Sequence, residues 1–319
     1  MEIFNHNSNV NFLGMRKISI CIAILLMIAS IGLISVKHLN YGLDFTGGVS
    51  LVVDYEQPVT TVEVQEALEK GGIEHSLVAS LGGTREVSVR FQPTAAMKDD
   101  EGKINLDKVS AVATAVLKAG GRSDVSVKSR DYVSSTVGEE LRSDGIVAAV
   151  VVMLGIGLYL GIRFEWRFAV AAIVTELHDA LVTVGIFALV QREFDLTVLA
   201  SVLAVIGYSI NDKVVVFDRV RELFRSSRKA EPEEILNRSI NSTLSRTIIT
   251  SLFTGITMAA LYFIGGPVVH GFAITMLIGI LVGTLSSIFV ASPILLWLGV
   301  SKQDLMPRSK ENPELARRP

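Results

Sequence analysis

The sequence is poor in cysteine and histidine, with 1 Cys and 5 His among 319 residues. Cys21, the one cysteine, lies inside an apolar run, so an intrachain disulfide and a cysteine-based zinc site are both excluded. No second histidine stands at a ligand spacing from His178. We therefore expect no bound metal, no cofactor and no enzymatic activity.

The sequence also lacks an excess of positive charge. It has 30 Lys and Arg against 32 Asp and Glu, which gives a formal net charge of −2. Proteins that bind nucleic acids usually need a basic surface that displaces counterions from phosphates. A nucleic-acid partner is therefore not expected.

Apolar residues, by contrast, are abundant and clustered. They make up 50% of the chain, and the mean hydropathy is +0.47. Runs of about 18 or more apolar residues are long enough to cross the hydrocarbon core of a membrane as a helix. The sequence has six such runs, at residues 18–36, 145–162, 168–190, 196–217, 247–264 and 270–298. It predicts a polytopic α-helical membrane protein with six transmembrane helices.

The distribution of basic residues predicts the orientation of these helices. Basic residues in short loops mark the cytoplasmic side of a membrane. They occur in the N-terminal segment 1–17, between the second and third helices (Arg163 and Arg167), between the fourth and fifth helices, and in the tail 299–319. We interpret the first run as a retained signal anchor, because no small-residue cleavage site follows it. Both termini are thus predicted to be cytoplasmic, with residues 37–144 on the opposite side.

The long segment 37–144 has the pattern of a small α/β domain. Strand-like alternation and helical spacing follow one another at 49–55 (strand), 60–70 (helix), 76–79 and 86–91 (strands), 106–118 (helix) and 124–127 (strand). This order predicts a ferredoxin-like βαββαβ extracytoplasmic domain between the first two transmembrane helices. It contains no cluster of catalytic residues, so we interpret it as a docking or substrate-contacting module.

The fourth predicted helix carries an acid where the chain should be apolar. An ionisable side chain at membrane depth costs at least about 2.5 kcal/mol, so it marks a functional site by default. Asp212 follows Asn211 and a stripe of small residues that would let another helix approach closely. We interpret it as a protonatable carboxylate; the alternative is a fixed hydrogen-bond network. If the neighbouring Lys213 extends to the cytoplasmic interface, Asp212 would lie near that interface.

The fifth predicted helix begins with Arg246 and continues with a face of Ser and Thr side chains. Arginine does not lose its proton in proteins, so Arg246 is predicted to act as a fixed cation that pairs with ionised Asp212. The alternative is an interfacial arginine that ends a basic loop. Proton occupancy of Asp212 would then make and break this pair and shift the fourth and fifth helices.

The third predicted helix holds Glu176, His178 and Asp179. The two acids are three residues apart and share a helix face, whereas His178 is expected to point elsewhere. Asp179 is predicted to belong to a proton relay or a polar network, and Glu176 is interpreted as incidental.

The sixth predicted helix has a small residue at every fourth position. These residues are Gly271, Thr275, Gly279, Gly283, Ser287 and Ala291. Such spacing forms a flat seam that allows close packing between helices. We expect Gly271, Gly279, Gly283 and Ser287 to pack against another helix of this chain or of a partner.

Several motifs together resemble a known family. They are Gly-Leu-Asp-Phe-Thr-Gly-Gly at 42–48, Gly-Tyr-Ser-Ile-Asn-Asp at 207–212 with Asp-Arg-Val-Arg at 218–221, Ser-Arg-Thr at 245–247 and Gly-Gly-Pro at 265–267. This set, and the order of the six helices, is similar to the SecF proteins of the SecD/SecF family, which resemble half of an RND-superfamily transporter. Lys213 departs from the pattern, because a small hydroxylated residue is expected there.

The resemblance implies a function and partners. It implies a six-helix RND-like half bundle in a bacterial inner membrane that pairs with SecD and uses the proton motive force to assist the SecYEG translocon in exporting unfolded preproteins. YajC and YidC are further candidate partners. Asp212 and Arg246 match family positions in the proton pathway, together with Asn211, and His178 and Asp179 match a family pair in the third helix. The rival interpretation is an RND-type exporter of small molecules or lipids.

Overall fold

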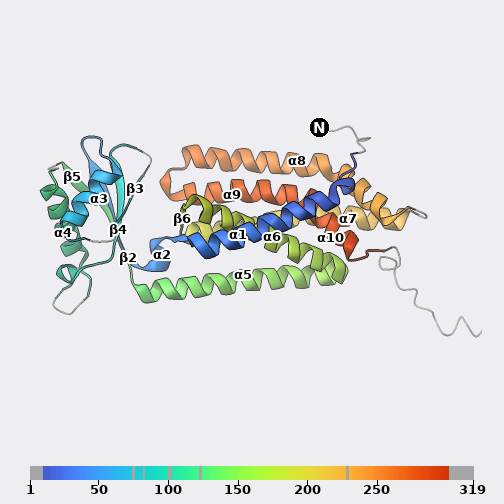
Figure 1. Ribbon diagram of the computed structural model, residues 1–319, viewed down its shortest axis with the longest axis horizontal. Coiled ribbons are helices and arrows are strands. Elements are labelled where there is room, and N and C mark those ends of the chain that lie inside the picture. Colours follow the sequence, from blue (N-terminus) through green and yellow to red (C-terminus); the bar gives the residue numbers. More distant parts are fainter. Residues whose placement is uncertain are drawn as a thin grey trace, which may run out of the picture.

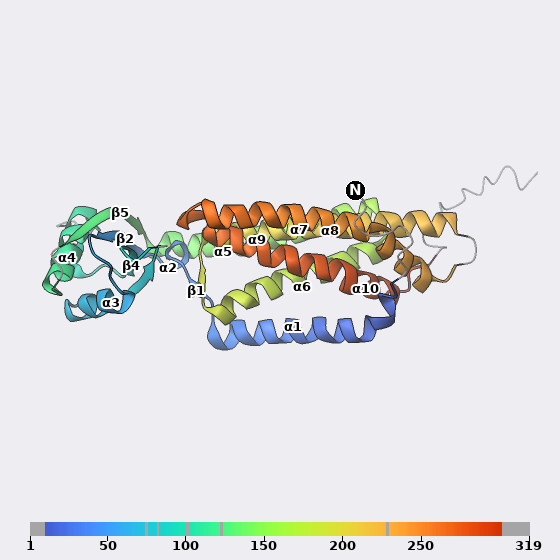
Figure 2. The same ribbon diagram turned by 90° about the horizontal axis from the view of Figure 1, so that it is seen from above.

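The computed structural model describes residues 10–73, 76–81, 83–99, 103–121, 124–227 and 230–301. The molecule is elongated, with a helical bundle at one end and a small sheet domain at the other (Figure 1 and Figure 2). Three parts of the predicted cytoplasmic side lie outside the described residues. They are most of the tail, part of the N-terminal segment, and Arg228 and Lys229 between the fourth and fifth predicted helices.

Six helices are long and apolar enough to cross a membrane, as predicted. They are α1 (Arg16–Lys37), α5 (Ser135–Arg163), α6 (Trp166–Val190), α7 (Leu196–Ser226), α8 (Pro232–Ile264) and the helix that starts with α9 (Pro267–Ser286). Large apolar side chains such as Leu25, Leu158 and Ile264 are exposed on their outer faces. A helix surface of this kind is stable where lipid covers it.

Three of these helices extend well beyond their apolar runs. Helix α5 begins at Ser135, where Ser134 Oγ accepts a hydrogen bond from the backbone N–H of Val137 at 3.3 Å. Helix α7 runs on to Ser226, and α8 starts at Pro232, so the two helices also pack outside the apolar region through Leu223, Phe224, Ile235 and Leu236. Hydropathy locates the part of a helix that lies in lipid and does not detect its polar extensions.

The sixth helix covers the predicted apolar run and contains a π-helical turn. After α9 the chain forms a π-helical segment, η3 (Ser287–Ala291), and then α10 (Ser292–Trp297). Pro293 has no backbone N–H and its ring displaces the carbonyl one turn earlier, which accounts for the widened turn just before it.

The sheet domain has the predicted ferredoxin-like order. Its elements are β2 (Gly48–Tyr55), α3 (Thr61–Lys70), β3 (Leu77–Ser80), β4 (Glu86–Phe91), α4 (Leu106–Ala119) and β5 (Val125–Val133). The four strands form an antiparallel sheet in the order β3-β4-β2-β5. Its core includes Leu51, Val89, Leu68 and Leu117, so α3 and α4 cover one face of the sheet. Strand β5 is longer than predicted because its polar second half pairs with the backbone of β2, which sequence periodicity does not show.

A short segment joins the sheet domain to the bundle. Strand β1 (Asn40–Tyr41) pairs in parallel with β6 (Glu193–Phe194), and the one-turn helix α2 (Leu43–Thr46) follows β1. The backbone N–H of Leu196, at the start of α7, donates to Asp44 Oδ2 at 2.9 Å. Arg90 of β4 forms an ion pair with Glu193 of β6. The predicted Gly-rich motif thus lies where the domain meets α7.

The small residues of α9 lie against α7. A Cβ atom added to Gly279 would overlap Val205, and one added to Gly283 would lie 2.6 Å from Ser209 Oγ. A Cβ on Gly271 would lie 3.0 Å from Val198. Ser287 is buried in η3, where its hydroxyl donates to the Thr284 carbonyl at 2.9 Å. The structure therefore places the three glycines in close contact with a helix of the same chain.

Gly279→Ala should destabilise the chain, although Ala favours helices more than Gly by about 1 kcal/mol. The added methyl group would force α7 and α9 apart, and overpacking of this kind typically costs about 1–3 kcal/mol. Gly255→Ala in α8 is the matched control, because a Cβ there meets nothing within 4 Å. Thermal unfolding of the detergent-solubilised chain should show a lower Tm for Gly279→Ala only. Equal Tm values for the two variants would contradict the packing role.

Candidate functional site

Lys213 of α7 lies at the centre of a buried charged cluster. Its side chain is 0% exposed, and its ammonium group donates to three oxygens. These are Glu176 Oε1 at 2.6 Å, Asp179 Oδ2 at 2.8 Å and Ser209 Oγ at 2.7 Å. A single cation therefore connects two acids of α6 to a hydroxyl group one turn earlier on its own helix.

Asp179 connects this cluster to a third helix. Its Oδ2 atom also accepts hydrogen bonds from Ser209 and from Ser286 of α9, both at 2.7 Å. The other carboxylate oxygen lies 2.9 Å from Nδ1 of His178. Because α6, α7 and α9 all contribute to its partners, Asp179 fixes the relative positions of these helices.

The structure corrects three interpretations of these residues. Lys213 does not extend to the cytoplasmic interface, because two acids of α6 offer it charged partners inside the bundle. Glu176 is not incidental, because it is one of these partners. His178 does not point away from the acids but hydrogen-bonds to Asp179. Ser286, the contribution of α9, could not be recognised in the sequence, since a serine in a helix rich in small residues gives no signal of its own.

The cluster combines two carboxyl groups with one ammonium group inside the bundle. Removing charges from water costs several kcal/mol for each ion, and only good geometry with further hydrogen bonds offsets this cost. Asp179 meets that condition with four contacts, whereas Glu176 depends mainly on its bond to Lys213. Within the described part of the chain, Glu176 Oε2 and His178 Nε2 are buried without a hydrogen-bond partner. Both carboxylate oxygens of Asp179 therefore have hydrogen-bond partners, whereas one polar atom each of Glu176 and His178 has none among the described residues.

Asp212 lies next to Lys213 in the sequence but belongs to a different polar group. Its side chain contacts α8, where Ser251 Oγ donates to Asp212 Oδ2 at 3.5 Å. Ser251 in turn lies 2.7 Å from the hydroxyl of Thr284 on α9. Asp212 is only 3% exposed, so this carboxyl group is enclosed by α7, α8 and α9. The hydroxylated face predicted for the fifth helix thus supplies its polar partner.

Arg246 and Asn211 lie on an open face of the bundle. Both residues are exposed, and a Cβ atom added to nearby Gly207 would meet nothing within 4 Å. Among the described residues, no oxygen of Asp212 lies within the 4.0 Å ion-pair distance of the Arg246 guanidinium. The predicted Asp212–Arg246 pair is therefore not formed in this structure, and its formation in another state stays a prediction.

Lys213→Met should destabilise the chain by about 3–5 kcal/mol, because it leaves two buried acids without their cation. Adding Glu176→Gln and Asp179→Asn to it should restore much of the lost stability, since the acids then no longer need a counter-charge. Lys37→Met, at the exposed end of α1, is the matched control. Thermal unfolding in detergent measures all three variants. A Tm of Lys213→Met equal to that of wild type would show that the cluster does not hold the helices together.

Two family models match the chain. Residues 112–301 match the C-terminal model of the protein export membrane proteins SecD and SecF. Residues 32–59 match the SecD/SecF GG motif, and this range covers the end of α1, the segment that joins the bundle to the sheet domain, and strand β2. The first match alone covers more than half of the chain and includes every residue of both polar groups.

Curated relatives and solved structures agree with these models. The protein translocase subunit SecF of Pseudomonas aeruginosa is 42% identical over 298 residues, which are 93% of this chain and 94% of the relative. SecF of Escherichia coli O157:H7 is 38% identical over 98% of this chain and 95% of the relative.

The solved structure of SecDF from Thermus thermophilus, a translocon-associated membrane protein, is 34% identical and superposes with a TM-score of 0.81 over 93% of this chain. SecDF in its super-membrane-facing form gives a TM-score of 0.68. The chain spans 39% and 40% of the length of these two SecDF chains. With a multi-pass bundle, a ferredoxin-like domain and these relatives, the chain belongs to the SecD/SecF family of protein-export membrane proteins.

Proposed function

We propose that the chain is the SecF-type subunit of a bacterial Sec translocase, in which it works with SecD to drive late steps of protein export by the proton motive force. The observation that carries the coupling mechanism is Asp212, a buried carboxyl group with a hydroxyl partner between α7, α8 and α9. In this proposal the chain lies in the inner membrane with both termini in the cytoplasm and the sheet domain in the periplasm. The arginines at both ends of the α5–α6 turn support that orientation.

A proton that binds and leaves Asp212 can do mechanical work because it carries its charge through the membrane potential. A charge that crosses the full membrane potential releases about 2.3 kcal/mol per 100 mV. An energy of this size shifts a two-state equilibrium by about fiftyfold, which is enough to drive a domain movement. In the protonated state the neutral carboxyl group needs no cation, and the hydroxyl of Ser251 can remain its partner. In the ionised state it would attract Arg246, so that α7 and α8 move relative to one another.

The open face around Gly207, Asn211 and Arg246 fits a docking site for SecD. Small residues let a helix of the partner approach closely, and the partner would cover polar groups that lipid cannot satisfy. The two solved SecDF chains are more than twice as long as the part that matches this chain. Their additional length supports a second half bundle as the partner.

The connection between α7 and the sheet domain offers a route for the movement. Helix α7 begins with a backbone N–H that is bonded to Asp44, and β6 just before it is ion-paired to Arg90 of β4. A shift of α7 would therefore pull directly on the domain. In this proposal the domain holds the emerging unfolded preprotein while SecYEG provides the channel, and YajC and YidC are accessory partners.

Asp212→Asn should abolish the proton-dependent part of export, up to about fiftyfold at 100 mV, because the neutral amide cannot exchange a proton. Asp212→Glu should keep part of it. Asp218→Asn is the matched control on the same helix, since Asp218 is exposed and paired with Arg163 at 3.4 Å. The measurement is the rate at which a reporter preprotein is exported, with and without a protonophore, in cells that carry each variant together with SecD.

Two results would contradict the proposal. If Asp212→Asn exported the reporter at the wild-type rate and stayed sensitive to the protonophore, Asp212 would not be the coupling group. If cells that lack the chain exported normally but became sensitive to drugs, the chain would instead be an RND-type exporter of small molecules.

A further inference from the structure

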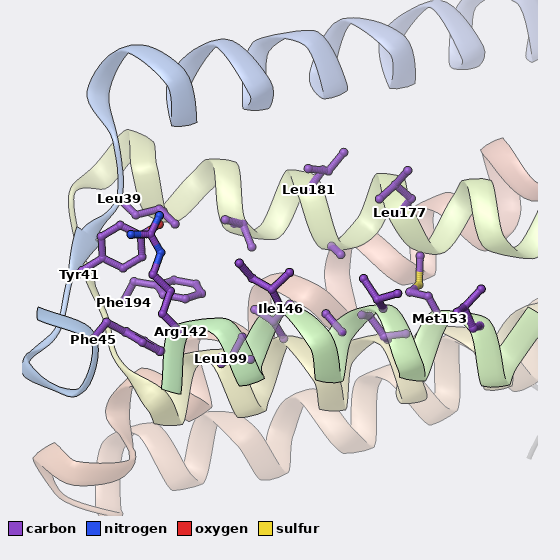
Figure 3. A pocket seen from close by; sticks show the side chains of 18 residues that line it. Leu39, Tyr41, Phe45, Arg142, Ile146, Met153, Leu177, Leu181, Phe194 and Leu199 are labelled. Atoms are coloured by element: carbon purple, nitrogen blue, oxygen red, sulfur yellow. The ribbon is translucent and has the colours of Figure 1, made fainter. Parts of the chain in front are cut away.

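A long apolar groove lies between α5, α6 and α7 near the sheet-domain end of the bundle (Figure 3). Its volume is about 520 Å³, within the range of about 300–1,000 Å³ that small-ligand sites occupy. Figure 3 shows Ile146 and Met153 of α5 on one side and Leu177 and Leu181 of α6 on the other. The groove runs along the membrane-spanning part of the bundle, so it lies at the depth of acyl chains.

The groove exists because α5 approaches the bundle closely at two glycines. Gly145 packs against Leu199 of α7, and a Cβ atom added to Gly157 would lie 2.6 Å from Ile173 of α6. Between these positions the small side chains of Ala149 and Ala180 leave the space unfilled. Val150 and Leu154 of α5 line the groove and are themselves exposed, so the groove opens toward lipid.

One end of the groove carries a single cation. Among the described residues, Arg142 is the only charged one that lines the groove, and its guanidinium lies 5.0 Å from the centre of the Tyr41 ring. In the described residues, no carboxylate lies within 4.0 Å of Arg142. Arg142 precedes the apolar run of α5 by one turn, so with that run in the hydrocarbon core its guanidinium would lie near the phosphate groups. Glu139 lies another turn farther out along α5, and Asp144 lies on a different face of the helix.

We infer that this groove binds an anionic phospholipid, with its phosphate on Arg142 and an acyl chain along α5 and α6. A cation at the interface attracts anionic headgroups, and an apolar channel below it matches the tail. A helix of a partner fits less well. With a diameter of about 10 Å, it would fill 520 Å³ with little more than one turn. The bound lipid would fill the gap between the two glycine contacts and brace α5, which has few other neighbours.

Arg142→Gln should lower the amount of retained phosphatidylglycerol about fivefold, the effect expected for one basic residue near an anionic surface. The full-length chain, co-expressed with SecD, is solubilised in mild detergent with equal amounts of phosphatidylglycerol and phosphatidylethanolamine, and bound lipid is counted by native mass spectrometry. Arg192→Gln is the matched control, because Arg192 follows α6 on the same side of the bundle but does not line the groove. Retention of phosphatidylglycerol should be unchanged in this control.

A second variant tests the part of the groove proposed to hold the acyl chain, without changing the charge of the protein. Ala149→Phe fills the groove and should reduce the retention of both lipids, whereas Val147→Phe on the exposed face of α5 should not. Thermal unfolding confirms that the variants are folded. Unchanged retention in Arg142→Gln or in Ala149→Phe would overturn the proposal. A photoreactive residue at Met153 that cross-links to a protein and not to lipid would also overturn it, because the groove would then be a protein interface.

Discussion

The contact on which the bundle depends is the one between Lys213 and the two acids of α6. A buried ammonium group without partners would be costly in a membrane protein, and so would the two carboxyl groups. Paired with one another, the ammonium and carboxyl groups link α6 to α7. The hydrogen bond from Ser286 to Asp179 links α9 to the same cluster. Apolar packing between helices gives little orientation in lipid, because lipid tails are as apolar as the helices. The charged cluster, with the glycine seam between α7 and α9, fixes which faces meet.

Asp212 and Lys213 divide the polar interior of the bundle into two groups with different properties. Adjacent residues of a helix point about 100° apart, so Lys213 contacts α6 while Asp212 contacts α8 and α9. The Lys213 group contains charges of both signs in direct contact and is suited to a fixed structural role. Among the described residues, the contacts of the Asp212 group within hydrogen-bond distance are hydroxyl groups, and a carboxyl group in such surroundings can change its charge with less loss of bonding. A rigid shift of α7 would move both groups together.

The sheet domain and the groove show how the bundle connects with what lies around it. The domain is held by the β1–β6 pair, by Asp44 and by the ion pair between Arg90 and Glu193, all of them at the start of α7. The aromatic residues Tyr41, Phe45 and Phe194 of this connection also close one end of the apolar groove. A lipid in the groove would therefore contact the segment that links the domain to α7, and the membrane itself would contribute to the stiffness of that link.

The sequence by itself determined the six spans and the βαββαβ domain, because both follow from local patterns. A run of apolar residues is long enough to cross a membrane or it is not, and the periods of 2 and 3.6 residues are read within one element. It also selected Asp179 and Asp212, since an acid inside an apolar run is costly wherever it lies.

Only the tertiary structure decided what those residues contact. Lys213 turned inward because Glu176 and Asp179 of a helix more than thirty residues away face it, and Arg246 stayed on an open face. The β1–β6 pair likewise joins segments about 150 residues apart, and no local pattern contains that information.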